Sequence, residues 1–518
     1  MVLFVVVFIL LNSRYNIIAQ SLLKILKFDK TKTLYYNLSS LKMKRQKLMK
    51  ALCSFIVLTL IPFDLLAADF SGDDLSICWG IPFVGILFSI ALMPLFLSRL
   101  WHYHYGKIIT FWTMLFVLFA LYSFGLQTTI NLTAHAIIAE YIPFLLLLLA
   151  LFTVSGGILI KSDVLSTPKL NVGLLAIGTL LASIMGTTGA AMLMIRPVIR
   201  ANRQRNYAVH TIVFFIFLVA NIGGGLTPLG DPPLFIGFLK GVNFGWTIQH
   251  MLLPVLFSSI LLLAIYYKID CYYFRTQYGD SFTLTSAKKA SAIKVYGVSN
   301  IFLLAIIIAC VLMSGIWHSS VNFTVLGTHI ALQNLIRDTI FIMITLFSML
   351  ITPKQVRAGN EFNWEPIIEV AKLFIGIFIT IVPVLAILRA GSHGALAPIV
   401  SLVTNEQGQP INSMYFWLSG LLSGFLDNAP TYLVFFNLAS GDATILMNIL
   451  EKTLLAISMG SVFMGALSYI GNAPNLMVKS IAIQNKINMP SFFSYMKWSV
   501  CILIPVFIID NLVFFLLF

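Results

Sequence analysis

The sequence predicts an all-α polytopic membrane protein, on three observations. Of its 518 residues, 59% are hydrophobic and only 10% are charged, whereas soluble domains carry about 25% charged residues. The mean hydropathy of +0.93 comes from continuous apolar stretches, and a transmembrane helix needs roughly 20 such residues. In the strands of an outer-membrane barrel, apolar and polar residues alternate. These stretches show no such alternation.

The charge pattern agrees with this fold class. The net charge of +14 arises from 33 Lys and Arg against 19 Asp and Glu. The basic residues lie between apolar stretches, so we interpret them as cytoplasmic loops under the positive-inside rule and not as a nucleic-acid surface. The five cysteines are scattered without a CxxC pair, which fits neither a zinc site nor a disulfide framework.

Residues 1–68 are predicted to form an N-terminal extension with a signal-like segment. Basic residues at 43–50 precede an apolar segment at 51–61 and the small residues Ala67 and Ala68, which is the layout of a signal peptide. Leu65 and Leu66 occupy positions where cleavage needs a small residue. An uncleaved first helix is therefore the alternative.

The distribution of Lys and Arg predicts the topology. We place in the cytoplasm the segments rich in these residues, which are 99–107, 161–169, 196–205, 268–294 and 354–372. We place outside the segments without them, which are 127–133, 241–246, 316–327, 391–410 and 441–449. The chain between 169 and 196 must then be a re-entrant hairpin with its tip near Gly186, and 411–448 a second one from outside with its tip near Asp427.

Two hairpins that enter from opposite sides predict inverted repeats, in residues 69–295 and 296–518. An offset of 241 residues relates matching positions of the two halves, which are Gly186 and Asp427, Gly224 and Gly465, Gly230 and Gly471, Asp231 and Asn472, and Pro233 and Pro474. In each half the tip is followed by a helix that Gly and Pro break. This order predicts an inverted-repeat transporter with two re-entrant hairpins and two discontinuous helices.

The four interruptions are the candidate site. Unwound backbone at membrane depth is tolerated where it is buried in protein or lines a cavity, and half-helix ends near the midplane bind substrates and ions in such transporters. One break alone could serve packing or a kink, but two matched pairs favour a site. Intramembrane carboxylates are functional by default, so Asp231 and Asp427 are the main candidates, with capping of the next helix as the alternative for Asp231.

Polar side chains at the same breaks complete the predicted ion- and substrate-binding set, which consists of Thr187, Thr188, Asn221, Thr227, Asn428, Thr431, Ser468, Asn472 and Asn475. Hydroxyl groups often bond their own helix backbone, so position is the argument for the Thr and Ser residues. Arg389 and His393 are secondary candidates, and Glu140 is expected at the membrane interface.

The sequence lacks the motifs of several classes of membrane protein. It contains no G-x-x-x-x-G-K-[ST] loop, no HExxH motif and no paired Cys/His cluster, so an ATP-driven pump and a membrane metalloprotease are excluded. We therefore expect a secondary transporter, not an enzyme, and no cofactor.

At these residues the sequence resembles the ion transporter superfamily that includes the arsenite carrier, dicarboxylate and citrate carriers and NhaD-type sodium/proton antiporters. The likeness runs from residue 77 to 518, and its most specific parts are Glu140–Phe144 with Ser155–Gly157, Gly186–Ala191, Gly223–Pro233 and Leu426–Thr431. This set is most similar to the NhaD-like branch, whose members are often labelled sodium/proton antiporters or citrate transporters. The resemblance implies two inverted repeats and a homodimer.

One departure from the superfamily guides the functional prediction. Its dicarboxylate carriers have Ser-Asn-Thr at both hairpin tips, whereas this chain has Gly186-Thr187-Thr188 and Asp427-Asn428-Ala429. The change favours Asp231 and Asp427 as groups that hold a proton or a transported metal cation, because hard cations prefer oxygen ligands.

We therefore expect a proton-coupled Na+ or Li+ antiporter of the cytoplasmic (inner) membrane, whose partners are these ions and membrane lipid. The main alternative is a carrier of citrate or another organic or inorganic anion. Such a carrier would need positive groups, supplied by half-helix N-termini and Arg389. A non-transporting scaffold is disfavoured by the paired breaks.

Overall fold

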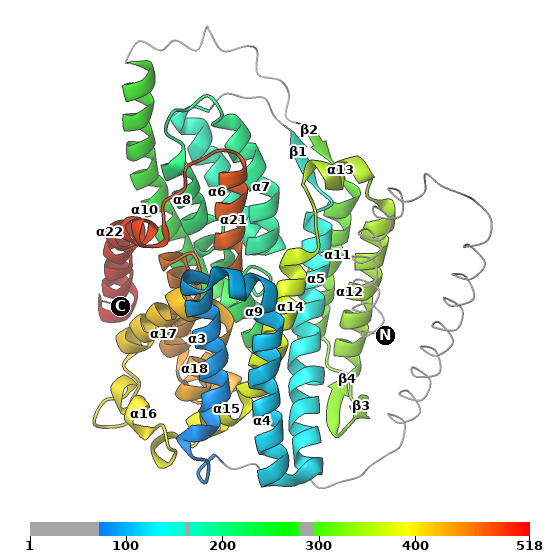
Figure 1. Ribbon diagram of the computed structural model, residues 1–518. Coiled ribbons are helices and arrows are strands. Elements are labelled where there is room, and N and C mark those ends of the chain that lie inside the picture. The colour runs from blue at the N-terminus through cyan, green and yellow to red at the C-terminus, as the bar shows by residue number, and fades with distance from the viewer. Residues whose placement is uncertain (1–71, 162–165, 280–293, 518) are drawn as a thin grey trace, which may run out of the picture.

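The computed structural model describes residues 72–161, 166–279 and 294–517 (Figure 1). The predicted N-terminal extension lies outside these residues. Eight helices of the described chain are long and apolar enough to cross a membrane, which confirms the prediction of a helical, polytopic membrane protein. The described strands form two antiparallel ribbons, β1 (Leu159–Lys161) with β2 (Lys294–Tyr296) and β3 (Asn322–Val325) with β4 (Thr328–Ala331).

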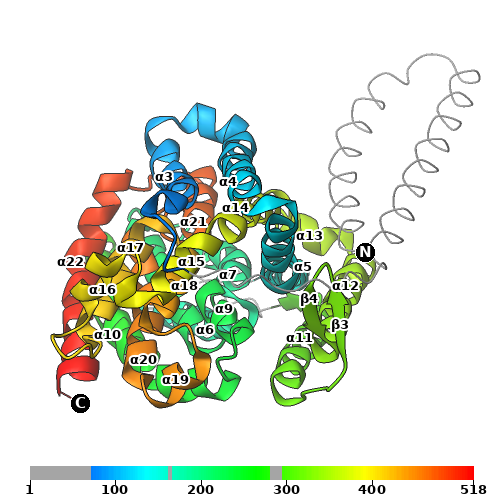
Figure 2. The same cartoon turned by 90° about the horizontal axis from the view of Figure 1, so that it is seen from below.

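One side of the molecule is a group of helices that we call the frame (Figure 2). Its members are α4 (Ser98–His135), the π-helix η2 (Ala136–Tyr141), α5 (Ile142–Ser155), α11 (Ser299–Ile316), α12 (Leu332–Ile351), α13 (Lys354–Gly359) and α14 (Glu365–Thr380). Helix α5 packs against α11 and α12, and α14 packs against α4 and η2. The Tyr141 hydroxyl donates to the Ala371 carbonyl at 2.9 Å, which joins η2 to α14.

A second group, which we call the core bundle, contains the predicted tips and breaks. From the first half of the chain it takes α6 (Pro168–Met185), α7 (Thr187–Ala201), α8 (Val209–Leu218), η3 (Ile222–Leu226), α9 (Pro232–Leu239) and α10 (Phe244–Tyr278). From the second half it takes α17 (Asn412–Leu426), α18 (Asn428–Ala439), α19 (Ala443–Asn448), α20 (Glu451–Phe463), η6 (Met464–Leu467), α21 (Ala473–Gln484) and α22 (Phe492–Asn511).

The remaining elements connect or flank these groups. They are η1 (Ile77–Gly80), α3 (Ile81–Phe96), α15 (Val382–Arg389), η5 (Gly391–His393), α16 (Ala397–Val403) and the π-helix η7 (Leu512–Leu517). Helices α14 and α15 meet at a bend of 43°. Helix α4 breaks at Gly125, whose φ of 77° and ψ of 174° are not helical.

The 99–107 segment corrects one expectation from the charge pattern. It was expected as a loop, but α4 begins at Ser98 and runs through it. Leu97, with φ −130°, is the one residue between α3 and α4. The polar and aromatic side chains of this segment favour an interfacial position. Such side chains are also compatible with a continuous helix, and the segment is the first part of α4.

Proline and glycine place the helix ends around the site. Pro232 is the first residue of α9, and Pro474 lies in the first turn of α21, where the missing N–H has no helical partner to lose. Gly186 separates α6 from α7 with φ 81° and ψ 150°, a conformation that glycine adopts without a steric penalty. The helix ends thus follow directly from the residue types.

Positions 241 residues apart have closely similar backbone conformations. Gly186 (φ 81°, ψ 150°) matches Asp427 (φ 82°, ψ 147°). Thr227 (φ −135°, ψ 159°) matches Ser468 (φ −137°, ψ 169°). Asp231 and Asn472 are both extended, with φ −137° and −150°. The tip and the break are therefore built alike in the two halves of the chain.

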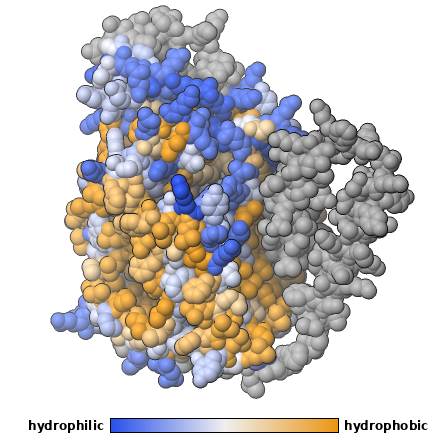
Figure 3. Space-filling view, viewed as in Figure 1, coloured by the Kyte–Doolittle hydropathy of each residue, from blue (hydrophilic) through white to orange (hydrophobic). Residues whose placement is uncertain are grey.

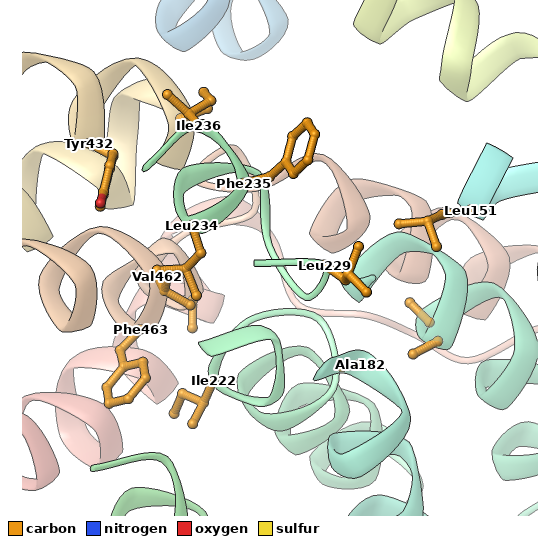
Figure 4. Close-up of a cluster of buried hydrophobic side chains, with 14 of the residues drawn as sticks. Leu151, Ala182, Ile222, Leu229, Leu234, Phe235, Ile236, Tyr432, Val462 and Phe463 are labelled. Atoms are coloured by element: carbon orange, nitrogen blue, oxygen red, sulfur yellow. The ribbon is translucent and has the colours of Figure 1, made fainter. Parts of the chain in front are cut away.

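Apolar packing holds the short helix α9 in place. Figure 4 shows Leu234 beside Val462 of α20, while Phe235 and Ile236 leave α9 in other directions. All four side chains are buried. Because lipid is as apolar as these side chains, van der Waals contact rather than release from water fixes α9.

Polar and apolar residues are separated on the surface. On the face shown in Figure 3, hydrophilic residues gather at the upper end and along the lower rim, and a broad apolar band lies between them. Large side chains such as Phe302, Met343 and Leu350 are exposed on α11 and α12. This is the surface that a bilayer-spanning bundle presents to lipid.

Candidate functional site

The carboxylate of Asp231 joins all four interruptions of the backbone. Asp231 ends the first break, and its side chain is only 2% exposed. Its Oδ1 accepts from Thr187 Oγ1 of the first tip at 2.9 Å and from Asn472 Nδ2 of the second break at 3.2 Å. Its Oδ2 accepts from Asn428 Nδ2 of the second tip at 2.6 Å. Donors up to 241 positions away from Asp231 thus share its carboxylate.

The alternative role of Asp231 as a helix cap is wrong. Asp231 occupies the position before α9, but its side chain makes no hydrogen bond to the α9 backbone. Its oxygens are instead turned to the tips and to the second break. A buried carboxylate with three donors is well satisfied, so tertiary partners have replaced the local cap.

Asn472 and two further amides extend this network across both breaks. Asn472 Nδ2 also donates to the Ala220 carbonyl at 3.0 Å. Asn221 Nδ2 donates to Asn475 Oδ1 at 2.8 Å. Asn475 Nδ2 in turn donates to the carbonyls of Gly465 and Ser468, each at 2.9 Å. The carbonyls freed by the second break are therefore satisfied by predicted site residues.

Asp427 is placed differently from Asp231. It is half-buried, and it holds a φ of 82°, which is uncommon for a residue with a side chain. Its Oδ1 accepts from Ala429 N at 3.4 Å. Thr431 Oγ1 donates to the Asp427 backbone carbonyl at 2.8 Å. Thr431 therefore stabilises the backbone of the tip and does not donate to the carboxylate.

The two hydroxyl residues of the breaks hold backbone. Thr227 Oγ1 donates to the Ser183 carbonyl and Ser468 Oγ donates to the Gly424 carbonyl, at 2.5 and 2.6 Å. Each also accepts from a backbone N–H two residues later, at 3.2 and 3.1 Å. These matched contacts fasten each break to the helix before its tip, and neither residue lines the cavity described next.

A cavity of about 520 Å³ reaches the site. Of the predicted site residues, it is lined by Thr187, Thr188, Asp231, Asp427 and Asn472. Its volume lies within the range of about 300–1,000 Å³ that is typical of ligand pockets. The cavity therefore offers a small ion or molecule access to both aspartates.

The charged groups on the cavity wall are mostly acidic. Besides the two aspartates they are Glu361, Glu365, Glu369 and Arg196. Arg196 Nη2 is 3.0 Å from Glu361 Oε2, so its charge is already paired. The described wall thus has five carboxylates and one guanidinium.

Sequence reasoning missed these three glutamates because the 354–372 segment was interpreted as a basic loop. Glu365 and Glu369 lie four residues apart in the first turns of α14, a spacing that places two side chains on one helix face. That spacing was a signal in the sequence. The position of α14 on the same cavity wall as the core bundle could not be obtained from the sequence.

Three other candidates lie away from the cavity wall. Arg389 Nε donates to Asn437 Oδ1 at 2.7 Å, and His393 is exposed. Neither residue lines the cavity. Glu140 forms an ion pair with Lys240 at the end of α9, and the two side chains are only 14% and 18% exposed. Glu140 therefore links the frame to the core bundle.

Oxygen atoms are the ligands that the site offers to a metal ion. Among the described residues, no three His, Cys, Asp or Glu side chains are grouped as ligands of a resident metal ion. Asp427, Asp231 and Thr188 bring oxygen atoms to the cavity wall. The arrangement suits transient binding of a small ion.

The paired helix breaks, the buried carboxylates and the apolar spanning helices define a multi-pass membrane transporter. Residues 72–515 match the family described as "Putative citrate transport". The chain belongs to this family, which agrees with the citrate transporter branch of the ion transporter superfamily.

Proposed function

We propose that this transporter exchanges protons for Na+ or Li+ across the cytoplasmic membrane. The observation that carries the proposal is the charge of the cavity wall, where five carboxylates face one arginine that Glu361 already pairs. A citrate anion in this cavity would meet charges of its own sign, and Coulomb repulsion is strong where water is scarce. A small cation would be attracted.

We further propose that residues 69–295 and 296–518 are inverted repeats with re-entrant hairpins. The matching dihedral angles at Gly186 and Asp427 support a common origin of the two tips. The basic segments on either side of the first hairpin support its entrance from the cytoplasm. A homodimer, which the family resemblance implies, belongs to the same proposal.

A carrier of citrate or a related anion is the second candidate, and two observations favour it. The family description names citrate transport. In addition, Thr187, Thr188 and Gly189, at the N-terminus of α7, line the cavity. A helix N-terminus carries about half a positive charge and attracts anions. Arg389, which the anion hypothesis needed, does not line the cavity.

Reconstituted vesicles distinguish the two candidates. Na+ or Li+ added to vesicles with an imposed pH gradient should dissipate the gradient, and Asp427→Asn should abolish this response. Glu406→Gln, which removes an exposed acid outside the cavity, is the matched control and should behave as wild type. Accumulation of labelled citrate by wild type without any cation-induced proton movement would replace the antiporter with the anion carrier.

A further inference from the structure

We propose that the two aspartates have different tasks: Asp427 contacts the transported cation, whereas Asp231 is a positioning residue that holds the two tips and the second break together. This inference rests on the proposed function, in which both carboxylates belong to the cation site. It assigns their roles from their hydrogen-bond partners.

The first step is the occupancy of the Asp231 carboxylate. A carboxylate offers about four lone-pair positions, and Asp231 uses three of them for Thr187, Asn428 and Asn472. A cation that bound both oxygens would have to displace these donors. Since the side chain is 2% exposed, Asp231 is better placed to organise protein groups than to receive an ion.

The second step is that the donors to Asp231 are held in orientation. Asn428 Oδ1 lies 2.8 Å from Ser423 Oγ, whose one hydrogen is shared with the Ser461 carbonyl at 2.6 Å, and the Asn428 amide nitrogen is turned toward Asp231. Asn472 Nδ2 also donates to the Ala220 carbonyl at 3.0 Å, which holds its amide group in place. A second contact of each amide group thus fixes the orientation in which it donates to Asp231.

The third step is the contrast with Asp427. Its carboxylate has no side-chain donor among the described residues, accepts only from backbone N–H groups of its own tip, such as Ala429 N at 3.4 Å, and lines the cavity. The matching position of the first tip is Gly186, which has no side chain, so one tip alone brings a carboxylate to the cavity. The φ of 82° at Asp427 costs conformational energy, and such strain persists where function requires the side chain.

An exchange of side chains tests the positioning role. Asp231→Asn alone places an amide nitrogen against the amide nitrogen of Asn428 or Asn472, and Asn428→Asp alone places two carboxylates together. The double variant Asp231→Asn/Asn428→Asp restores the bond with its direction reversed. It also leaves acceptors for Thr187, Asn472 and Ser423, and it keeps the net charge.

The full-length protein is purified in detergent and reconstituted in vesicles, with Glu406→Gln as the control. We expect each single variant to lower the transport rate about tenfold or more, and the double variant to recover transport and the wild-type melting temperature. Asp427→Asn should keep the melting temperature measured in choline chloride. It should lose transport and the additional stabilisation that NaCl gives the wild type.

Two results would overturn the assignment. A double variant that regains its melting temperature but not its transport would place Asp231 in contact with the cargo. An Asp427→Asn protein that is still stabilised by NaCl would remove Asp427 from that role. If wild type responds to citrate and not to Na+, the antiporter proposal fails by itself. In that case the assignment of Asp427 as the cation contact also fails. The positioning role of Asp231 is then tested by whether the double variant recovers citrate transport.

Discussion

Replacing Gly465 with alanine should force the two halves of the site apart. Gly465 lies in η6 and is buried. A Cβ atom at this position would overlap Asn428 Oδ1 and lie 2.9 Å from Asn221 Oδ1. Neither amide can withdraw freely, because Asn428 is bonded to Asp231 and Asn221 to Asn475.

The cost follows from these contacts. Overpacking by one methyl group in a fixed environment costs about 1–3 kcal/mol. If Asn428 is displaced, its hydrogen bond to the carboxylate is lost, which costs about 1.5–3 kcal/mol. The sum of about 2.5–6 kcal/mol is a large part of the about 5–15 kcal/mol that stabilises a typical protein.

The assay is thermal unfolding of the purified protein in detergent, together with transport in vesicles. Gly465→Ala should melt at a lower temperature than wild type and lose transport. Gly173→Ala is the control, because no atom lies within 4 Å of its added Cβ and alanine stabilises a helix by about 0.5–1 kcal/mol. A Gly465→Ala protein that melts and transports like wild type would refute the close packing of Asn428 and Asn221 against this glycine.

Three further predictions test other parts of the structure. Asp427→Gly should remove the strain at φ 82° and stabilise the protein by about 1 kcal/mol while abolishing transport; a lower melting temperature would contradict this. Glu140→Gln should leave the Lys240 charge without its partner and cost about 1–3 kcal/mol, seen as a lower melting temperature that Glu140→Gln/Lys240→Gln partly restores. In a cysteine-free background, Arg203→Cys should label with impermeant reagents from the cytoplasm and Gln407→Cys from outside, and labelling of both from one side would reject the inverted topology.

The helix breaks could be located from the sequence because local chemistry determines them. Gly186, Pro232 and Pro474 restrict where a helix can begin or end, and the structure has a boundary at or beside each. The role of Asp231 could not be obtained in this way, because local rules favoured a cap. Its partners Asn428 and Asn472 are 197 and 241 residues away.

The acidic cavity wall was beyond sequence reasoning for a similar reason. Glu361 and Glu365 belong to the 354–372 segment, which was placed by its lysines and arginines alone although it holds as many acids as bases. Only the tertiary fold places these acids on a common cavity wall with Asp427. The sequence alone identified the residues of the two hairpin tips. Tertiary packing decides which side chains lie across the cavity from them.

The contacts between the frame and the rest of the chain have a consequence for biosynthesis. Glu140 pairs with a lysine 100 residues later, and Tyr141 bonds a carbonyl 230 residues later. At about 5–20 residues per second, ribosomes deliver these partners after about 5–20 s and about 10–50 s. Until then the stretch Ser98–Ser155 carries an acid and a phenol without partners in an apolar segment, which is costly in lipid. We therefore expect the nascent chain to be retained beside the insertion machinery until α9 and α14 have emerged, and ribosomes that stall between residues 155 and 240 to yield a chain that is quickly degraded.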